Sequence, residues 1–284
     1  MSNPVLSIGD KDAEVGVLHQ DLIEQGFDCN GDVATHDFGP VTESVVKLFQ
    51  ACHIGPNGQN LTVDGIVGSA TWWALDHPSG SDQHQPITDM PVQAASNPIA
   101  AAALASALAE LNKDVYEILD GSNRGPEIDL YTGMEGRPIP PIGPPWCAYF
   151  VSWNFAKASK GSPFGRIGGA QTIALWCLKH ILGSVTDVST KLHSLPMLET
   201  AVLKGIFTGA LGDDQPYVPR CGDIGVIANG QVHGHAVHVQ AALGETVWTV
   251  EGNSGNAVRA RKRLVTEFKW FVNFDVYAKS KGIV

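Results

Sequence analysis

With 284 residues, the chain is long enough for two domains. Its 19 basic and 29 acidic side chains give a formal net charge of −10. This balance argues against nucleic acid or an anionic membrane surface as a partner, because both require broad positive charge. One basic cluster has the spacing of a solvated strand, with contact to an acidic polymer as the alternative; it consists of Arg259, Arg261, Lys262 and Arg263.

No targeting or membrane-spanning segment stands out. The opening MSNPVLSIGDKDAEV lacks a basic and an apolar region, and the longest apolar run, residues 99–111, is too short to cross a bilayer. We therefore expect a monomer that is made in the cytoplasm without a signal peptide and does not insert into membranes. The five cysteines contain no C-x-x-C pair, which disfavours a disulfide scaffold. Pairing of Cys29 with Cys52 stays open.

The first 77 residues have the pattern of three short helices. EVGVLHQDLIEQGF (14–27) and VTESVVKLFQACH (41–53) each place apolar residues on one helical face. DGIVGSATWWAL (64–75) adds a glycine-rich turn and a third helix. The sequence predicts a small all-α module over residues 1–77, close to the lower size limit for independent folding.

A polar segment separates this module from the rest of the chain. PSGSDQHQPITDMPVQAASN (78–97) has no apolar period, which predicts a linker. Asn97 and Pro98 then supply an N-cap and a first helical turn. We expect a second domain over residues 98–284.

Cys147 is the candidate nucleophile of the second domain. Prolines keep the chain extended as far as Pro145, and a helical apolar period begins after Trp146. The unsatisfied N–H groups at a helix N-terminus favour a thiolate, and the Cys147 N–H is suited to half of an oxyanion hole. Cys177 and Cys221 have apolar surroundings and are predicted to be structural.

A hairpin supplies the candidate base. HAVHVQAAL (235–243) and TVWTVEGN (246–253) are two strand-like runs joined by a two-residue turn that begins with glycine. In a regular hairpin His238 lies opposite Glu251 and diagonal to Asn253. The predicted roles are a base for His238, orientation of the imidazole for Glu251, and support of the ring for Asn253. His235 is predicted to lie on the opposite face.

The N-terminal motifs carry a family resemblance. LSIGDKDAEVGVLHQDLIEQGF, FGPVTESVVKLFQ and TVDGIVGSATWWAL resemble the three-helix peptidoglycan-binding module over residues 5–76. Asp12 replaces the second glycine of that pattern, His19 replaces a glutamine, and CHIGPNGQNLT lengthens the loop before Asp64. The resemblance implies bacterial peptidoglycan as a partner, with Asp64 and either Trp72 or Trp73 as substrate-binding residues.

The C-terminal motifs carry a second resemblance. PWCAYFVSW, CGDIGVI, HVQAAL and TVEGNSG, in this order, are similar to the CHAP family (cysteine, histidine-dependent amidohydrolase/peptidase) over residues 98–277. The resemblance implies an α+β fold: a papain-like catalytic domain with an antiparallel sheet. Some members carry an acidic calcium loop before the cysteine, but PIPPIGPPW occupies that place here, so no metal or other cofactor is expected. The family's four catalytic positions fall on Cys147, His238, Glu251 and Asn253. Gln240 stands where the family has a glycine.

Together the two resemblances imply a modular, endolysin-like peptidoglycan hydrolase. It is expected to act as an N-acetylmuramoyl-L-alanine amidase or as an endopeptidase of the stem peptide or cross-bridge, and to reach the wall after release by another system. One alternative is a zinc peptidase that uses His233 and His235 together with further ligands from His180, His193 or Asp223. The other is a wall-binding protein without catalysis.

Overall fold

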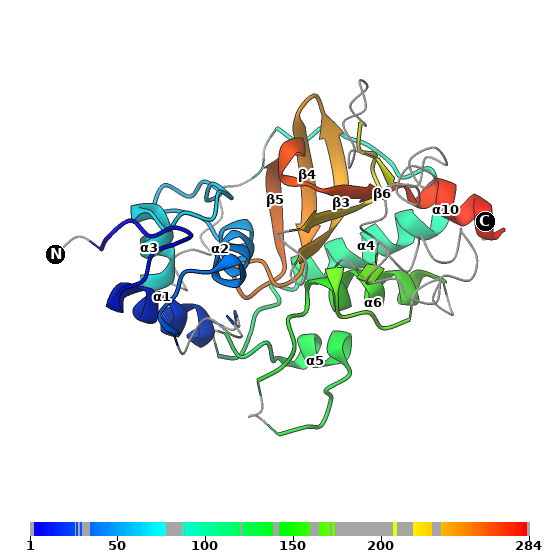
Figure 1. Ribbon diagram of the computed structural model, residues 1–284. Coiled ribbons are helices and arrows are strands. Elements are labelled where there is room, and N and C mark those ends of the chain that lie inside the picture. Colours follow the sequence, from blue (N-terminus) through cyan, green and yellow to red (C-terminus); the bar gives the residue numbers. More distant parts are fainter. Residues whose placement is uncertain are drawn as a thin grey trace.

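The computed structural model describes residues 3–25, 27, 29, 35–77, 87, 89–119, 121–138, 142–159, 165–170, 172–173, 207–208, 218–228 and 234–282. Within them the chain has mixed α+β structure, with a helical N-terminal part and an antiparallel sheet in the C-terminal part, which confirms the predicted class (Figure 1). Cys177, His180, His193 and His233 lie outside the described residues.

Three helices form the N-terminal module: α1 (Ala13–Glu24), α2 (Pro40–Cys52) and α3 (Ser69–Asp76). They share one apolar core, to which Leu18, Phe49 and Trp72 contribute. Asp12, which replaces a glycine of the family pattern, caps α1, because its Oδ1 accepts a hydrogen bond of 3.1 Å from the Val15 N–H. The predicted three-helix module is confirmed.

The C-terminal part is built on a six-stranded antiparallel sheet whose strands lie in the order β1-β6-β2-β3-β4-β5. All the pairings between neighbouring strands are antiparallel. A short 3-10 helix, η2 (Val265–Glu267), connects β5 to β6. The strands are β1 (Phe207–Thr208), β2 (Ile224–Ala228), β3 (Gly234–Leu243), β4 (Thr246–Glu251), β5 (Arg259–Leu264) and β6 (Trp270–Val272).

Helices cover one face of the sheet: α4 (Pro98–Asn112), α6 (Cys147–Ser159) and α10 (Phe274–Lys281), with α5 (Pro126–Thr132) packed beside α6. The predicted N-cap of α4 is confirmed, since Asn97 Oδ1 accepts from the N–H groups of Ile99 at 2.9 Å and Ala100 at 3.2 Å. Phe155 of α6 and Ala236 of β3 lie in the core between these helices and the sheet. Burial of this apolar surface is the main term that holds α6 on the sheet.

The opposite face of the sheet carries a second apolar cluster, which includes Val239, Val247 and Phe268. Val63 of the N-terminal module packs against it. The module also reaches β5 directly, where the Asn60 side-chain amide donates to the Lys262 carbonyl at 2.5 Å. The module thus docks on the sheet at its β5 side (Figure 1), through the loop that is lengthened relative to the family pattern.

The β3–β4 hairpin begins as predicted and then changes register. Leu243 lies opposite Thr246, but the pairing shifts between Val239 and Ala241 and leaves out Gln240. One unpaired residue in a strand is a β-bulge, and it exchanges the two faces for every residue beyond it. The predicted pairing of His238 with Glu251 is therefore wrong, because Val237 takes that position.

Candidate active site

Cys147 is the first residue of α6, as the sequence predicts, and its side chain is buried. The thiol lies 3.9 Å from the carbonyl oxygen of Gly234, the first residue of β3. The preceding residue, Trp146, is fixed by a hydrogen bond of 3.0 Å from its indole N–H to Glu117. Cys147 is thus held between a helix N-terminus and the start of a strand.

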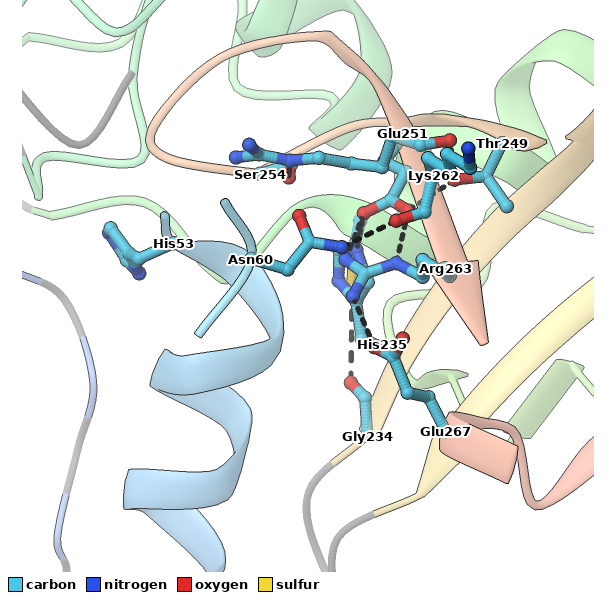
Figure 2. Close-up of polar contacts among 12 residues, drawn as sticks. His53, Asn60, Gly234, His235, Thr249, Glu251, Ser254, Lys262, Arg263 and Glu267 are labelled. Carbon is cyan, nitrogen blue, oxygen red and sulfur yellow. Dashed lines mark hydrogen bonds and ion pairs between the residues drawn. The ribbon is translucent and has the colours of Figure 1, made fainter. Parts of the chain in front are cut away.

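His235 is the histidine that joins the candidate site. Because the bulge reverses the faces of β3, His235 shares a face with Glu251, and its Nε2 lies 2.8 Å from Glu251 Oε2 (Figure 2). The His235 side chain also hydrogen-bonds the side chain of Cys147. With Nε2 on the carboxylate, Nδ1 is the ring nitrogen left for the thiol. Cysteine, imidazole and carboxylate therefore form one connected chain.

The surroundings of Cys147 favour its thiolate form. Burial by itself raises the pKa of the thiol, but the hydrogen bond and charge of His235 act in the opposite direction, as do the backbone N–H groups of Ala236 and Ala148. The balance lowers the pKa of Cys147 from its ordinary value of 9.0. A thiolate is the reactive form of cysteine, so the geometry favours a nucleophile.

A buried arginine holds the carboxylate of Glu251. The guanidinium of Arg263 donates through Nε to Oε1 and through Nη2 to Oε2, each at 2.6 Å (Figure 2). The Thr249 hydroxyl donates to Oε1 at 2.5 Å. Burial alone raises the pKa of Glu251, yet the charge and hydrogen bonds of Arg263, together with His235, hold this pKa well below its usual range. Glu251 is thus held in its ionised form at neutral pH.

The basic strand predicted as solvated is largely buried. Arg261 is 3% exposed and Arg263 2% exposed, so the expectation of a solvated strand is wrong for both. Arg261 Nε donates to the Ser254 hydroxyl at 2.8 Å, and Arg263 Nη1 lies 3.0 Å from Glu267. The alternation of arginines at positions 259, 261 and 263 could have indicated this burial, because alternate residues of a strand share one face.

His238 lies on the other face of β3 and does not meet Glu251. It pairs with Val250 and packs between the rings of Phe150 and Phe155, with ring centroids 5.8 and 5.5 Å away. Its Nε2 has no hydrogen-bond partner among the described residues. Burial lowers the pKa of His238 to about 3. The structure places His238 as an uncharged core residue.

Asn253 follows β4 in a left-handed turn with φ 58°. Its side-chain amide donates to Asn123 Oδ1 at 3.3 Å. The neighbouring Gly252 allows a close approach to α6, since a Cβ there would lie 2.6 Å from Phe150 and 2.9 Å from Trp146. The turn thereby fixes the end of β4 against the start of α6. Asn253 is thus linked to the start of α6 through Asn123, whose backbone N–H donates to Glu117, the partner of Trp146.

In the module, the two candidate binding residues differ. Trp72 is 4% exposed and its indole N–H donates to the Pro4 carbonyl at 2.7 Å, so Trp72 is a core residue and the expectation of a binding role is wrong. Trp73 is half-buried and stacks on His77 at 4.7 Å. Asp64 is exposed, but its Oδ1 accepts from Gln50 at 3.0 Å and shapes the glycine turn.

The structure also describes the side chains of two other cysteines and, besides His235, of one residue of the zinc alternative. The Cys29 thiol is buried 3.9 Å from the Phe27 carbonyl. Cys221 is half-buried, with its thiol 3.7 Å from the Gln93 carbonyl. Asp223, a ligand in the zinc alternative, accepts from the Arg220 N–H at 2.9 Å. No group of three or more metal-ligating side chains gathers within the described part of the chain.

Comparison with known proteins identifies the N-terminal part. Residues 11–75 match the family model described as a putative peptidoglycan binding domain. This domain supports targeting to the bacterial cell wall, with peptidoglycan as the partner. No curated protein and no solved structure matches the chain. In the portion that the structure describes, every helix is too short or too polar to cross a membrane.

Proposed function

We propose that the C-terminal part of the chain is a cysteine-dependent hydrolase that cleaves an amide bond in peptidoglycan, held on the wall by the N-terminal domain. The observation that carries the proposal is the connected chain of Cys147, His235 and Glu251 at the N-terminus of α6. A nucleophile, a base and a group that orients the base are the parts that acyl transfer requires. The peptidoglycan-binding domain at residues 11–75 supports the choice of substrate.

In the first half of the reaction, the Cys147 thiolate attacks the carbonyl carbon of the amide and forms a carbon–sulfur bond. The backbone N–H of Cys147, at the start of α6, stabilises the oxyanion that develops. The carbon–nitrogen bond then breaks, and His235 transfers a proton to the departing amine. The product of this half is a thioester on Cys147 and a free amino group.

In the second half, His235 removes a proton from water, and the resulting hydroxide attacks the thioester carbon. The carbon–sulfur bond breaks, the thiolate returns, and a carboxylic acid leaves. Glu251 accepts a hydrogen bond from His235 Nε2 throughout and so keeps Nδ1 directed at the sulfur. Because Arg263 and Thr249 hold both of its oxygens, Glu251 itself stays ionised.

The test is the clearing of purified peptidoglycan by the wild type, by Cys147→Ala, and by the wild type with a metal chelator. We expect Cys147→Ala to abolish clearing and the chelator to have no effect. If the chelator abolished clearing and Cys147→Ala still cleared peptidoglycan, the result would contradict the cysteine mechanism and favour the zinc peptidase. No clearing by the wild type, with retained binding to the wall, would indicate a binding protein.

The bond that is cut distinguishes an N-acetylmuramoyl-L-alanine amidase from an endopeptidase. Mass spectrometry of the digestion products identifies the residue that gains the new amino group. An amino group on L-alanine assigns the amidase, and one within the stem peptide or cross-bridge assigns the endopeptidase. The modular layout further supports an endolysin-like role, which requires release of the protein to the wall by another system.

A further inference from the structure

A cleft of about 1060 Å³ separates the N-terminal module from the β5 side of the sheet. Glu43 and Lys47 of α2 and the loop that contains Gln59 and Thr62 form one wall. The opposite wall runs from Thr246 along residues 260–269. This volume lies slightly above the range of about 300–1,000 Å³ that is typical of ligand sites. Both parts of the chain therefore contact whatever binds there.

The cleft is more positive than the rest of the protein. Five basic and three acidic side chains line it, a formal balance of +2, whereas the whole chain has a net charge of −10. Glu251 neutralises Arg263 from outside the lining, which leaves an excess of one positive charge, and such an excess favours a ligand of the opposite sign. The basic residues are Lys47, Arg261, Lys262, Arg263 and Lys269; the acidic residues are Glu43, Asp89 and Glu267.

Lys269 is the basic side chain best placed to meet a ligand. Lys47 pairs with Glu43, and Lys262 pairs with Asp89. Lys269 is exposed and lies over the Trp270 ring at 4.7 Å, and no acidic partner occurs for it within the described ranges. Exposed hydrogen-bonding groups also line the cleft, including Gln59, Thr62 and Thr266. One cation among neutral polar groups suits a carboxylate on a polar ligand.

We propose that this cleft binds the carboxylate-bearing stem peptide of peptidoglycan; the choice of polymer rests on the proposed function. The stem peptide carries carboxylates, whereas the hydroxyl and acetamido groups of the glycan strand are uncharged. Arg263 lines the cleft and also holds Glu251, so this one side chain links the cleft to the candidate active site, although Cys147, His235 and Glu251 do not line the cleft. A peptide in the cleft is thereby held by the module and the catalytic part together.

The test uses the full chain with Cys147→Ala, so that the ligand stays intact. Isothermal titration calorimetry measures binding of a soluble stem tetrapeptide and, separately, of a glycan tetrasaccharide without peptide. Lys269→Glu is added to the same background, with Lys279→Glu as the matched control, because Lys279 is an exposed lysine on α10 that does not line the cleft. Thermal melting of each variant confirms that it is folded.

We expect the tetrapeptide to bind and Lys269→Glu to weaken binding by up to about fivefold, since an exposed ion pair contributes at most about 1 kcal/mol. Lys279→Glu should leave the dissociation constant unchanged, and added salt should weaken the binding of the tetrapeptide. The inference is overturned if the tetrapeptide does not bind, if only the glycan binds, or if the two lysine variants behave alike. Catalysis is not measured here, so a wild type that clears peptidoglycan keeps the proposed function even when this inference fails.

Discussion

Two histidines three residues apart occupy opposite environments in β3. His235 contacts the thiol of Cys147 and the carboxylate of Glu251, so its imidazole has a hydrogen-bond partner on each side. His238 is enclosed by phenylalanine rings, which hold its pKa at about 3 and keep it neutral. Only His235 combines a nucleophile on one ring nitrogen with an orienting group on the other. Contact and burial, rather than residue type, therefore favour His235 as the proposed base.

Loss of His235 should change the titration of Cys147. In the wild type the pKa of the thiol lies below 9.0, so the rate of alkylation by iodoacetamide should rise below that pH. His235→Ala removes the favourable hydrogen bond and charge and leaves burial, which raises the pKa. The midpoint of the rate profile should therefore move to higher pH in His235→Ala. Identical midpoints in the two proteins would contradict the contact between the two side chains.

Arg263 should govern the ionisation of Glu251. Arg263→Met leaves a buried carboxylate without its cation, which typically costs about 3–5 kcal/mol of unfolding free energy. Arg263→Lys keeps the charge, loses the two parallel hydrogen bonds, and should cost less. Urea unfolding at pH 7 measures both. Equal stability of wild type and Arg263→Met would show that the ion pair contributes nothing.

The pH dependence of the same variants has a definite sign. The folded-state pKa of Glu251 is depressed below its ordinary 4.5. Its contribution to the wild type is therefore complete above about pH 4.5 and is lost as the pH falls toward the folded-state pKa. Without Arg263, burial dominates and raises this pKa, so Arg263→Met should lose its destabilisation as the carboxyl is protonated. The measurement is the unfolding free energy of the wild type and of Arg263→Met as the pH is lowered from neutral through 4.5.

At the scale of elements, the Gln240 bulge accounts for the difference between the expected and observed site. The turn at Gly244 and the pairing of Leu243 with Thr246 follow from the sequence, because glycine at the first turn position specifies a tight hairpin. A bulge leaves no comparable pattern, since a strand buried on both faces lacks the polar–apolar alternation that fixes register. Cys147 and Glu251 were predictable from local signals, whereas the choice between two histidines was not.

Deletion of Gln240 tests the bulge directly. Val239 and Ala241 already pair with adjacent residues of β4, so removing the extra residue should make the strand regular and keep His235 beside Glu251. The deletion variant should therefore retain most of the peptidoglycan-clearing activity of the wild type. In a regular hairpin that includes Gln240, the deletion would displace His238 from Glu251 and abolish clearing. A folded but inactive variant thus argues against the observed register.

At the scale of the whole molecule, the sequence indicates two parts but not how they meet. Helical periods and the glycine turn predict the module, and strand-like runs predict the sheet, because each pattern reports on one element. How the module packs on the sheet depends on the shapes of the two surfaces, and the hydrophobic periodicity of the sequence does not specify those shapes. The lengthened loop at residues 52–62 is a local sign of it, because Asn60 within the loop and Val63 directly after it contact the C-terminal part.

Val63→Asp should loosen the module from the sheet. The substitution places a charge against the apolar cluster that includes Val239, Val247 and Phe268, and burying a charge against apolar side chains costs free energy. Small-angle X-ray scattering should give a larger radius of gyration for Val63→Asp than for the wild type. Val17→Asp, at a 52% exposed position of α1, is the matched control and should leave the radius unchanged. A compact Val63→Asp protein would argue against this docking.

The most direct test of the Cys147–His235–Glu251 account compares the two histidines by activity. Release of soluble fragments from purified peptidoglycan is measured for wild type, His235→Ala and His238→Phe, each first checked for folding by circular dichroism. General acid–base catalysis contributes about 10²- to 10⁴-fold, so His235→Ala should lose activity by that factor. His238→Phe, in an apolar site between two phenylalanine rings, should retain most of it. An active His235→Ala together with an inactive, folded His238→Phe would contradict the account.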